Sequence, residues 1–262
     1  MRYAVHAEWT KLRTLRSTAW LLLGLVAATV VVGVSVASAV DTSHCPTPAR
    51  CFEDTTKDSL TGVRVGQIAV VLLAASMIGT EYGTGTIHTT LTAFPRRVLL
   101  LGGKASVLAG VVAAAGTVAV LGALWAGHAV LAANGFTPAN GYPDPSVTDG
   151  ATLRAVGGTV VYLVLVALLT FGVGAALRNT AGTTTVLLAL LYIAPLLVQA
   201  VSDPDWHRRL DGITPMTAGP AVQTTRGLER LPIGPWPGMA VLGGYTATAL
   251  LVGGVRFVRR DA

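Results

Sequence analysis

Residues 105–143, ASVLAGVVAAAGTVAVLGALWAGHAVLAANGFTPANGYP, form the longest stretch of the chain without a charged residue. A helix rises 1.5 Å per residue and needs roughly 20 apolar residues to cross the hydrocarbon of a membrane. The 39 residues are enough for two crossings. They contain no polar turn before Asn134-Gly135, however, so we expect one long or tilted helix over about 105–133.

The composition of the whole chain agrees with this stretch. The 262 residues are 52% hydrophobic and only 12% charged. Soluble domains contain about 25% charged residues. A soluble enzyme, a disordered chain and a small disulfide-stapled secreted domain are therefore excluded. The net charge of +6 would also suit a nucleic-acid-binding protein. The positions of the charges, between long apolar stretches, favour a membrane protein with no nucleic-acid partner.

Five further gaps between charged residues are long enough, or nearly long enough, for a membrane span. The second is the weakest, because Arg64 lies within it and must reach the outer interface along its aliphatic stem. The sequence thus predicts an all-α integral membrane protein, a single transmembrane domain over 1–262. Its six spans are expected at about 20–40, 60–80, 105–133, 155–177, 183–201 and 238–255.

The first span has a second interpretation, as a secretory signal peptide. Ala37-Ser38-Ala39 resembles a cleavage site, and cleavage would leave five spans. The apolar run has about twenty residues, against 7–15 in a typical signal. We expect the span to be retained as an anchor.

Lysine and arginine counts predict the orientation. If the N-terminus is cytoplasmic, the inner segments hold 11 of the 19 Lys and Arg and 3 of the 13 acids. The outer segments then hold 8 bases and 10 acids in many more residues. Inner segments of membrane proteins are enriched in Lys and Arg, so both termini are expected in the cytoplasm.

Residues 1–18 are expected to form an amphipathic helix along the membrane surface. Apolar side chains recur at helical spacing on one face, and polar ones fill the other. The stripe is Val5, Trp9, Leu12 and Leu15. The candidate interfacial residues are Trp9, Lys11, Arg13 and Arg16, with a bend at Arg16 before the membrane. The alternative is a basic flank that only sets topology.

The inner segment between the second and third spans reads TEYGTGTIHTTLTAFPRR over 80–97. Gly83 and Gly85 permit a sharp departure from the span, and 86–94 is predicted as a short helix that ends near Pro95. Arg96, Arg97 and Lys104 are expected to anchor the chain at the inner headgroups. A simple polar connector between the spans would explain the positive charges of this segment. The size of the segment, however, favours a docking element for a cytoplasmic partner. Its candidate residues are Glu81, Tyr82, Gly83, Thr84, Gly85, Thr86, Pro95, Arg96 and Arg97.

The outer segments carry fewer signals. Cys45 and Cys51 are the only cysteines, and a loop disulfide, free thiols and, least of all, a metal site are the alternatives. The stretch 202–237 holds too many prolines for an ordinary helix and is expected to form an outer cap or to dip into the membrane.

The chain shows no nucleotide-binding, zinc-protease or hydrolase motif, so we expect neither an enzyme nor a bound cofactor. Gln67 and Gln199 are the strongest polar side chains within the spans. They either join helices or line a path.

Three stretches resemble a known family: AEWTKLRTLRST at 7–18, the segment from Glu81 to Lys104, and VRFVRRDA at 255–262. The chain resembles the membrane permease subunit of ATP-binding-cassette (ABC) transporters of the type-2 export class. The likeness is to the small six-span form common in high-GC Gram-positive bacteria.

The resemblance implies a connecting helix over about 4–17 and a coupling helix within 81–97 that docks on a separate ATPase. It implies a working unit of two permease subunits, identical or siblings, and two ATPases in the bacterial cell membrane. ATP and magnesium would bind the ATPase. An uncharged path favours an apolar or amphiphilic export substrate. The alternative function is a non-transporting membrane scaffold or immunity-type protein. An intramembrane enzyme would need a buried nucleophile–base pair, which the sequence does not offer.

Overall fold

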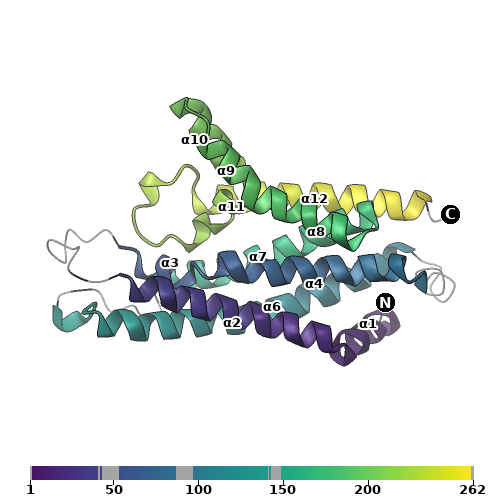
Figure 1. Ribbon diagram of the computed structural model, residues 1–262, viewed down its shortest axis with the longest axis horizontal. Coiled ribbons are helices and arrows are strands. Elements are labelled where there is room, and N and C mark those ends of the chain that lie inside the picture. Colours follow the sequence, from purple (N-terminus) through teal and green to yellow (C-terminus); the bar gives the residue numbers. More distant parts are fainter. Residues whose placement is uncertain are drawn as a thin grey trace.

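The computed structural model describes residues 2–40, 42, 53–86, 97–140, 142 and 149–260, and all regular elements in these residues are helices (Figure 1). Within them, six helical segments are long and apolar enough to cross a membrane. The chain is therefore a multi-pass membrane protein, as its composition predicts. The segments are α2 (Arg16–Ser38), α3–α4 (Thr55–Leu60 and Val63–Gly83), α6 (Arg97–Ala133), α7 (Gly150–Leu177), α8–α9 (Thr180–Leu188 and Ala194–Gln199) and α12 (Pro235–Arg260).

The third span is a single helix, which confirms the choice of one crossing over two. α6 has 37 residues and begins at Arg97, eight residues before the predicted start. The predicted start of the span was placed after the last charged residue, Lys104. The helix instead continues back through Lys104 to Arg97. Arg97 and Lys104 consequently lie two turns apart on the same helix, rather than on a loop.

The second span is interrupted between α3 and α4 by Thr61 and Gly62. The chain packs closely against α2 at this point: a Cβ on Gly62 would lie 2.0 Å from the carbonyl oxygen of Thr29. A Cβ on Gly66 would likewise lie 2.2 Å from the Thr29 hydroxyl oxygen, so two glycines one turn apart allow the helices to approach closely. Arg64 lies in the first turn of α4 with its side chain exposed.

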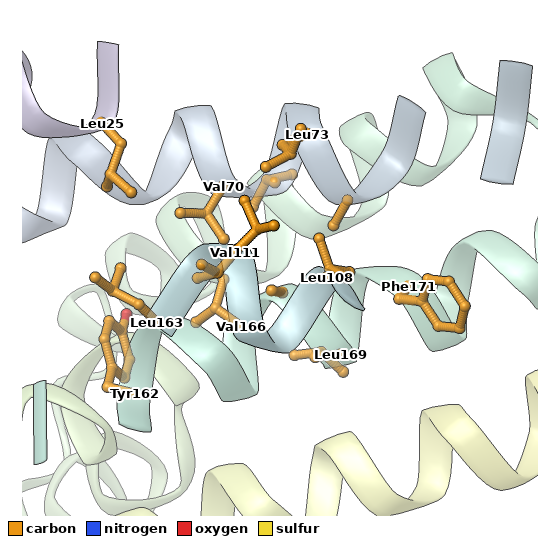
Figure 2. Packing of buried hydrophobic residues seen from close by; sticks show 14 of the residues in the cluster. Leu25, Val70, Leu73, Leu108, Val111, Tyr162, Leu163, Val166, Leu169 and Phe171 are labelled. Carbon is orange, nitrogen blue, oxygen red and sulfur yellow. The ribbon is translucent and has the colours of Figure 1, made fainter. Parts of the chain in front are cut away.

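The core lies around α7, which packs on α4, α6 and α12. Figure 2 shows its aromatic and aliphatic side chains interleaved with those of the neighbouring helices. The spans α2, α8–α9 and α12 keep most of their surface outside this core. Large apolar side chains such as Trp20, Leu196 and Leu251 are exposed there, as expected of surfaces that face lipid. The labelled core residues are Leu25, Val70, Leu73, Leu108, Val111, Tyr162, Leu163, Val166, Leu169 and Phe171.

The fifth span contains a π-helical turn, Ala189–Ile193, directly before Pro195. Proline lacks the N–H that an α-helix needs in its interior, and a wide turn accommodates the missing hydrogen bond. Figure 1 shows α9 and the following α10 (Pro204–Ile213) leaving the bundle obliquely.

The proline-rich stretch 202–237 is more helical than predicted. The expectation of no ordinary helix in 202–237 is wrong, because Pro204, Pro215 and Pro235 each stand at the first position of a helix, where no N–H is needed. α11 (Pro215–Ala218) and the 3₁₀ turn Pro220–Gln223 are buried against α7 and α12. Their burial agrees with packing of this stretch onto the bundle. Trp206 and Trp236 are exposed.

The first helix, α1 (Arg2–Thr14), is separated from α2 by Leu15 in an extended conformation, which confirms the predicted bend. In Figure 1 both ends of the chain lie at the same end of the bundle as the last turn of α4 and the first turn of α6. The prediction of a loop disulfide between Cys45 and Cys51 lies outside the described residues.

Candidate functional site

Three helices meet at the end of the bundle that holds both termini (Figure 1). α1 contributes Glu8 and Lys11, the last turn of α4 contributes Glu81, and α6 contributes Lys104. We call these four residues the ion cluster. Glu8 and Lys104, which are 96 positions apart in the sequence, are thereby brought into contact.

The ion cluster is tightly hydrogen-bonded. The Nζ of Lys104 donates to Glu8 Oε1 at 2.5 Å and to Glu81 Oε1 at 2.6 Å. The Nζ of Lys11 donates to the same Glu81 oxygen at 2.6 Å. Glu81 therefore accepts from two lysines and links α1 to α6 through α4.

Burial divides the cluster into an inner and an outer part. Lys104, Glu81 and Glu8 are 2%, 3% and 6% exposed, while the side chain of Lys11 is 43% exposed. A buried charge is tolerated only when it is paired and hydrogen-bonded. Two acids and two bases cancel, so the cluster as a whole is neutral.

The burial of Lys104 overturns one prediction. We expected this residue to anchor α6 at the lipid headgroups, but its ammonium lies inside the protein between two carboxylates. Sequence reasoning missed Lys104 as a partner of Glu81 and Glu8 as the second partner of Lys104. One signal was available: Glu8 and Glu81 are two of only three acids on the inner segments, and an acid on such a basic side calls for a paired base.

α1 presents a different face to the bundle from the predicted apolar stripe. Leu12 is 7% exposed and belongs to the core, whereas Trp9 and Leu15 are 48% and 44% exposed. Glu8 and Leu12, one turn apart, make the docked face. Arg16 is exposed, and the side chains of Val5 and Arg13 lie outside the described part of the chain.

The opposite side of the last turn of α4 carries Tyr82. The Arg178 guanidinium lies 5.1 Å from the centre of its ring. Tyr82 also packs beside Leu100 of α6 and Phe257 of α12. Glu81 and Tyr82 together bring the end of α4 into contact with α1, α6, α12 and the turn between α7 and α8.

The segment after α4 departs as predicted. α4 ends at Gly83, and Gly85 adopts a φ of 69°, a conformation that favours glycine. The Thr84 hydroxyl lies 2.8 Å from the Thr80 carbonyl oxygen and 2.9 Å from the Thr86 hydroxyl. Arg97 donates to the Val258 carbonyl at 3.2 Å. The predicted short helix over 86–94 falls, except for Thr86, on residues that the structure does not describe, as do Pro95 and Arg96.

The two candidate path residues lie apart. Gln67 is completely buried and its Nε2 donates to the hydroxyl of Tyr192 and the sulfur of Met216, both at 3.0 Å. The Tyr162 hydroxyl donates to Gln67 Oε1. Gln199 is exposed at the end of α9. The geometry of Gln67 favours the helix-joining alternative.

Within the described ranges, no group of three or more His, Cys, Asp or Glu side chains could hold a metal ion. The contacts of the ion cluster and of Tyr82 join helices. The chain matches no protein-family model and no curated protein.

Proposed function

We propose that this chain is the membrane-spanning subunit of an ATP-driven exporter of the type-2 ABC class. In this proposal the end of the bundle with the ion cluster faces the cytoplasm of a bacterial cell, and α1 lies along the inner leaflet. A separate ATPase binds the connection between α4 and α6. A second permease copy completes the unit, which moves an apolar or amphiphilic substrate.

The ion cluster is the observation that carries the proposal. A permease without its own motor must receive force at its cytoplasmic end and pass it to several spans at once. Glu81 stands six residues before the first undescribed residue of the connection and is bound to α1 and α6 by lysine ammonium groups. A force applied to residues 84–96 would therefore reach three helices through short, buried contacts.

A groove of about 410 Å³ next to the cluster adds support. It lies between α1, the start of α2 and the end of α4. Its lining includes Lys11, Glu8 and Glu81 of the cluster together with Leu15, Met77 and Thr84. Lys11 is thus reachable from outside while Lys104 is enclosed. A docked partner could touch the exposed rim without separating the inner ion pairs.

The test uses site-directed cross-linking in the native host. Thr86→Cys, in a chain whose Cys45 and Cys51 are replaced by serine, is expected to cross-link to an ATPase, with a yield that changes on ATP binding. Ser202→Cys, exposed at the far end of α9, is the matched control and should give no such product. Glu81→Gln should alter the hydrolysis rate of the co-purified ATPase, while Asp205→Asn on α10 should not. Absence of any ATPase product at Thr86 would favour the scaffold alternative.

A further inference from the structure

Arg178 stands in a conformation that its side chain does not favour. It ends α7 with φ 58° and ψ 22°, and it is the one non-glycine residue with positive φ in the described part of the chain. Glycine or asparagine normally occupies this position after a helix, because a Cβ atom crowds the following carbonyl. The arginine side chain must therefore provide contacts that offset this strain.

Two contacts of Arg178 link three parts of the bundle. Its guanidinium lies over the ring of Tyr82, at 5.1 Å, and its Nη2 donates to the carbonyl oxygen of Arg256 at 3.2 Å. The first contact is with the last turn of α4. The second is near the C-terminus of α12, where the helix dipole favours a positive charge.

The turn that holds Arg178 is pressed directly against α4. A Cβ on Gly79 would lie 2.0 Å from the Thr180 hydroxyl oxygen and 2.6 Å from the Thr180 backbone nitrogen. Gly79 is one turn before Tyr82, so α4 touches the start of α8 at two successive turns. The first turn of α8 is itself fixed by Asn179, whose side chain accepts a hydrogen bond from the Gly182 N–H at 2.8 Å.

α12 has a second attachment at the same level. Arg97, at the start of α6, donates to the Val258 carbonyl, two residues beyond the carbonyl that Arg178 binds. The C-terminal turns of α12 are thus held by arginines from two directions. The Arg178 contact connects these turns to the α7–α8 turn and, through Tyr82, adds a polar connection to the end of α4 beside the apolar contact between Phe257 and Tyr82.

We propose that Arg178 is a positioning residue that makes α8 and the C-terminal turns of α12 follow the end of α4. This inference rests on the proposed function, because it names a second route for the force received at 84–96. The ion cluster passes that force to α1 and α6, and Arg178 passes it to the last two spans. Among the described spans, α8–α9 and α12 are the least buried apart from α2, although α12 packs closely on α7.

The experiment measures hydrogen exchange of the permease–ATPase complex in lipid nanodiscs, with and without ATP and vanadate. The wild type should show a nucleotide-dependent change at 78–86 and also at 180–188 and 250–260. Arg178→Gly and Arg178→Asn both suit a positive φ but lack the guanidinium. In each, the change at 78–86 should persist, and that at 180–188 and 250–260 should fall about fivefold, which corresponds to roughly 1 kcal/mol of lost coupling.

The melting temperatures of the Arg178 variants distinguish a coupling role of this residue from a merely structural one. Arg178→Gly should melt at or above the wild-type temperature, since glycine removes the strain at this position. Arg178→Lys keeps a cation near Tyr82 and should restore part of the response. A full response at 180–188 and 250–260 in both Arg178→Gly and Arg178→Asn would overturn the inference. A wild type without any change at 78–86 would instead overturn the proposed function.

Discussion

Replacing Lys104 by methionine removes the ammonium group that two buried carboxylates share. The side chains are similar in length, so the change is mainly one of charge. The Lys104 ammonium is the donor to Glu8 Oε1, and Glu8 Oε2 is already buried without a partner. The substitution therefore leaves both oxygens of the Glu8 carboxylate without a donor. Glu81 keeps only the contact with Lys11 at 2.6 Å. Two carboxylates then remain buried with a single half-exposed lysine.

Breaking a buried ion pair by removing one partner costs about 3–5 kcal/mol. Lys11→Met is the matched control within the same cluster: its side chain is 43% exposed and makes one of the ion pairs, and such exposed pairs contribute about 0–1 kcal/mol. At about 2–4 °C per kcal/mol, Lys104→Met should lower the melting temperature by about 6–20 °C and Lys11→Met by at most about 4 °C. Size-exclusion chromatography of purified protein after stepwise heating measures both.

A triple variant tests the cause of this loss. Glu8→Gln, Glu81→Gln and Lys104→Met together remove every charge of the inner cluster, and neutral replacements of buried ion pairs are often tolerated. The triple variant should therefore recover most of the stability that Lys104→Met loses. If Lys104→Met melts within error of Lys11→Met, the buried pairs do not stabilise the junction. If the triple variant is no better than Lys104→Met, lost packing and not unpaired charge is the cause.

Three further substitutions have expected outcomes. Gln67→Leu removes the acceptor of the fully buried Tyr162 hydroxyl and should cost about 1–3 kcal/mol by melting temperature, whereas Gln199→Leu, at an exposed position, should cost nothing measurable. Gly79→Ala should cost about 1–3 kcal/mol through its clash with Thr180, whereas Gly102→Ala meets open space and should be neutral or stabilising. Asp54→Asn weakens acceptance from the N–H groups of Thr225 and Arg226, and amide exchange over 224–230 should quicken, with Asp205→Asn as the control.

The sequence predicted the spans well, because span formation depends on local composition. A stretch of about 20 residues without charge must be helical to cross lipid, whatever its neighbours are. The positions of span ends were less predictable. α6 extends back through Lys104 to Arg97 because the lysine is neutralised by glutamates from other helices, and no local pattern announces such partners. The helices of the stretch 204–223 were missed because proline was read as a helix breaker rather than as a helix starter.

Only part of the candidate site was predicted, because local patterns mark single residues but do not show their contacts with distant residues. Glu81 and Tyr82 stood out as polar residues at the edge of a span, and Lys11 as part of a basic helix. Their contacts join residues 70 and 96 positions apart, and sequence spacing alone does not show them. Arg178 entered the sequence analysis only as one of the 11 bases counted on the segments expected to face the cytoplasm. Its positive φ has no signature in the sequence, since an arginine there looks like any other loop residue.

The ion cluster also bears on the proposed orientation. The positive-inside count treats every lysine and arginine as a charge facing the cytoplasm. The cluster withdraws two lysines and two glutamates from that surface. Of the 11 bases and 3 acids on the inner segments, 9 bases and 1 acid remain outside the cluster, so the net charge is +8 with or without it. Because the cluster is neutral, it can be buried at the edge of the bundle without weakening the charge asymmetry. The orientation and the burial are therefore compatible, and the arginines outside the cluster sustain the orientation.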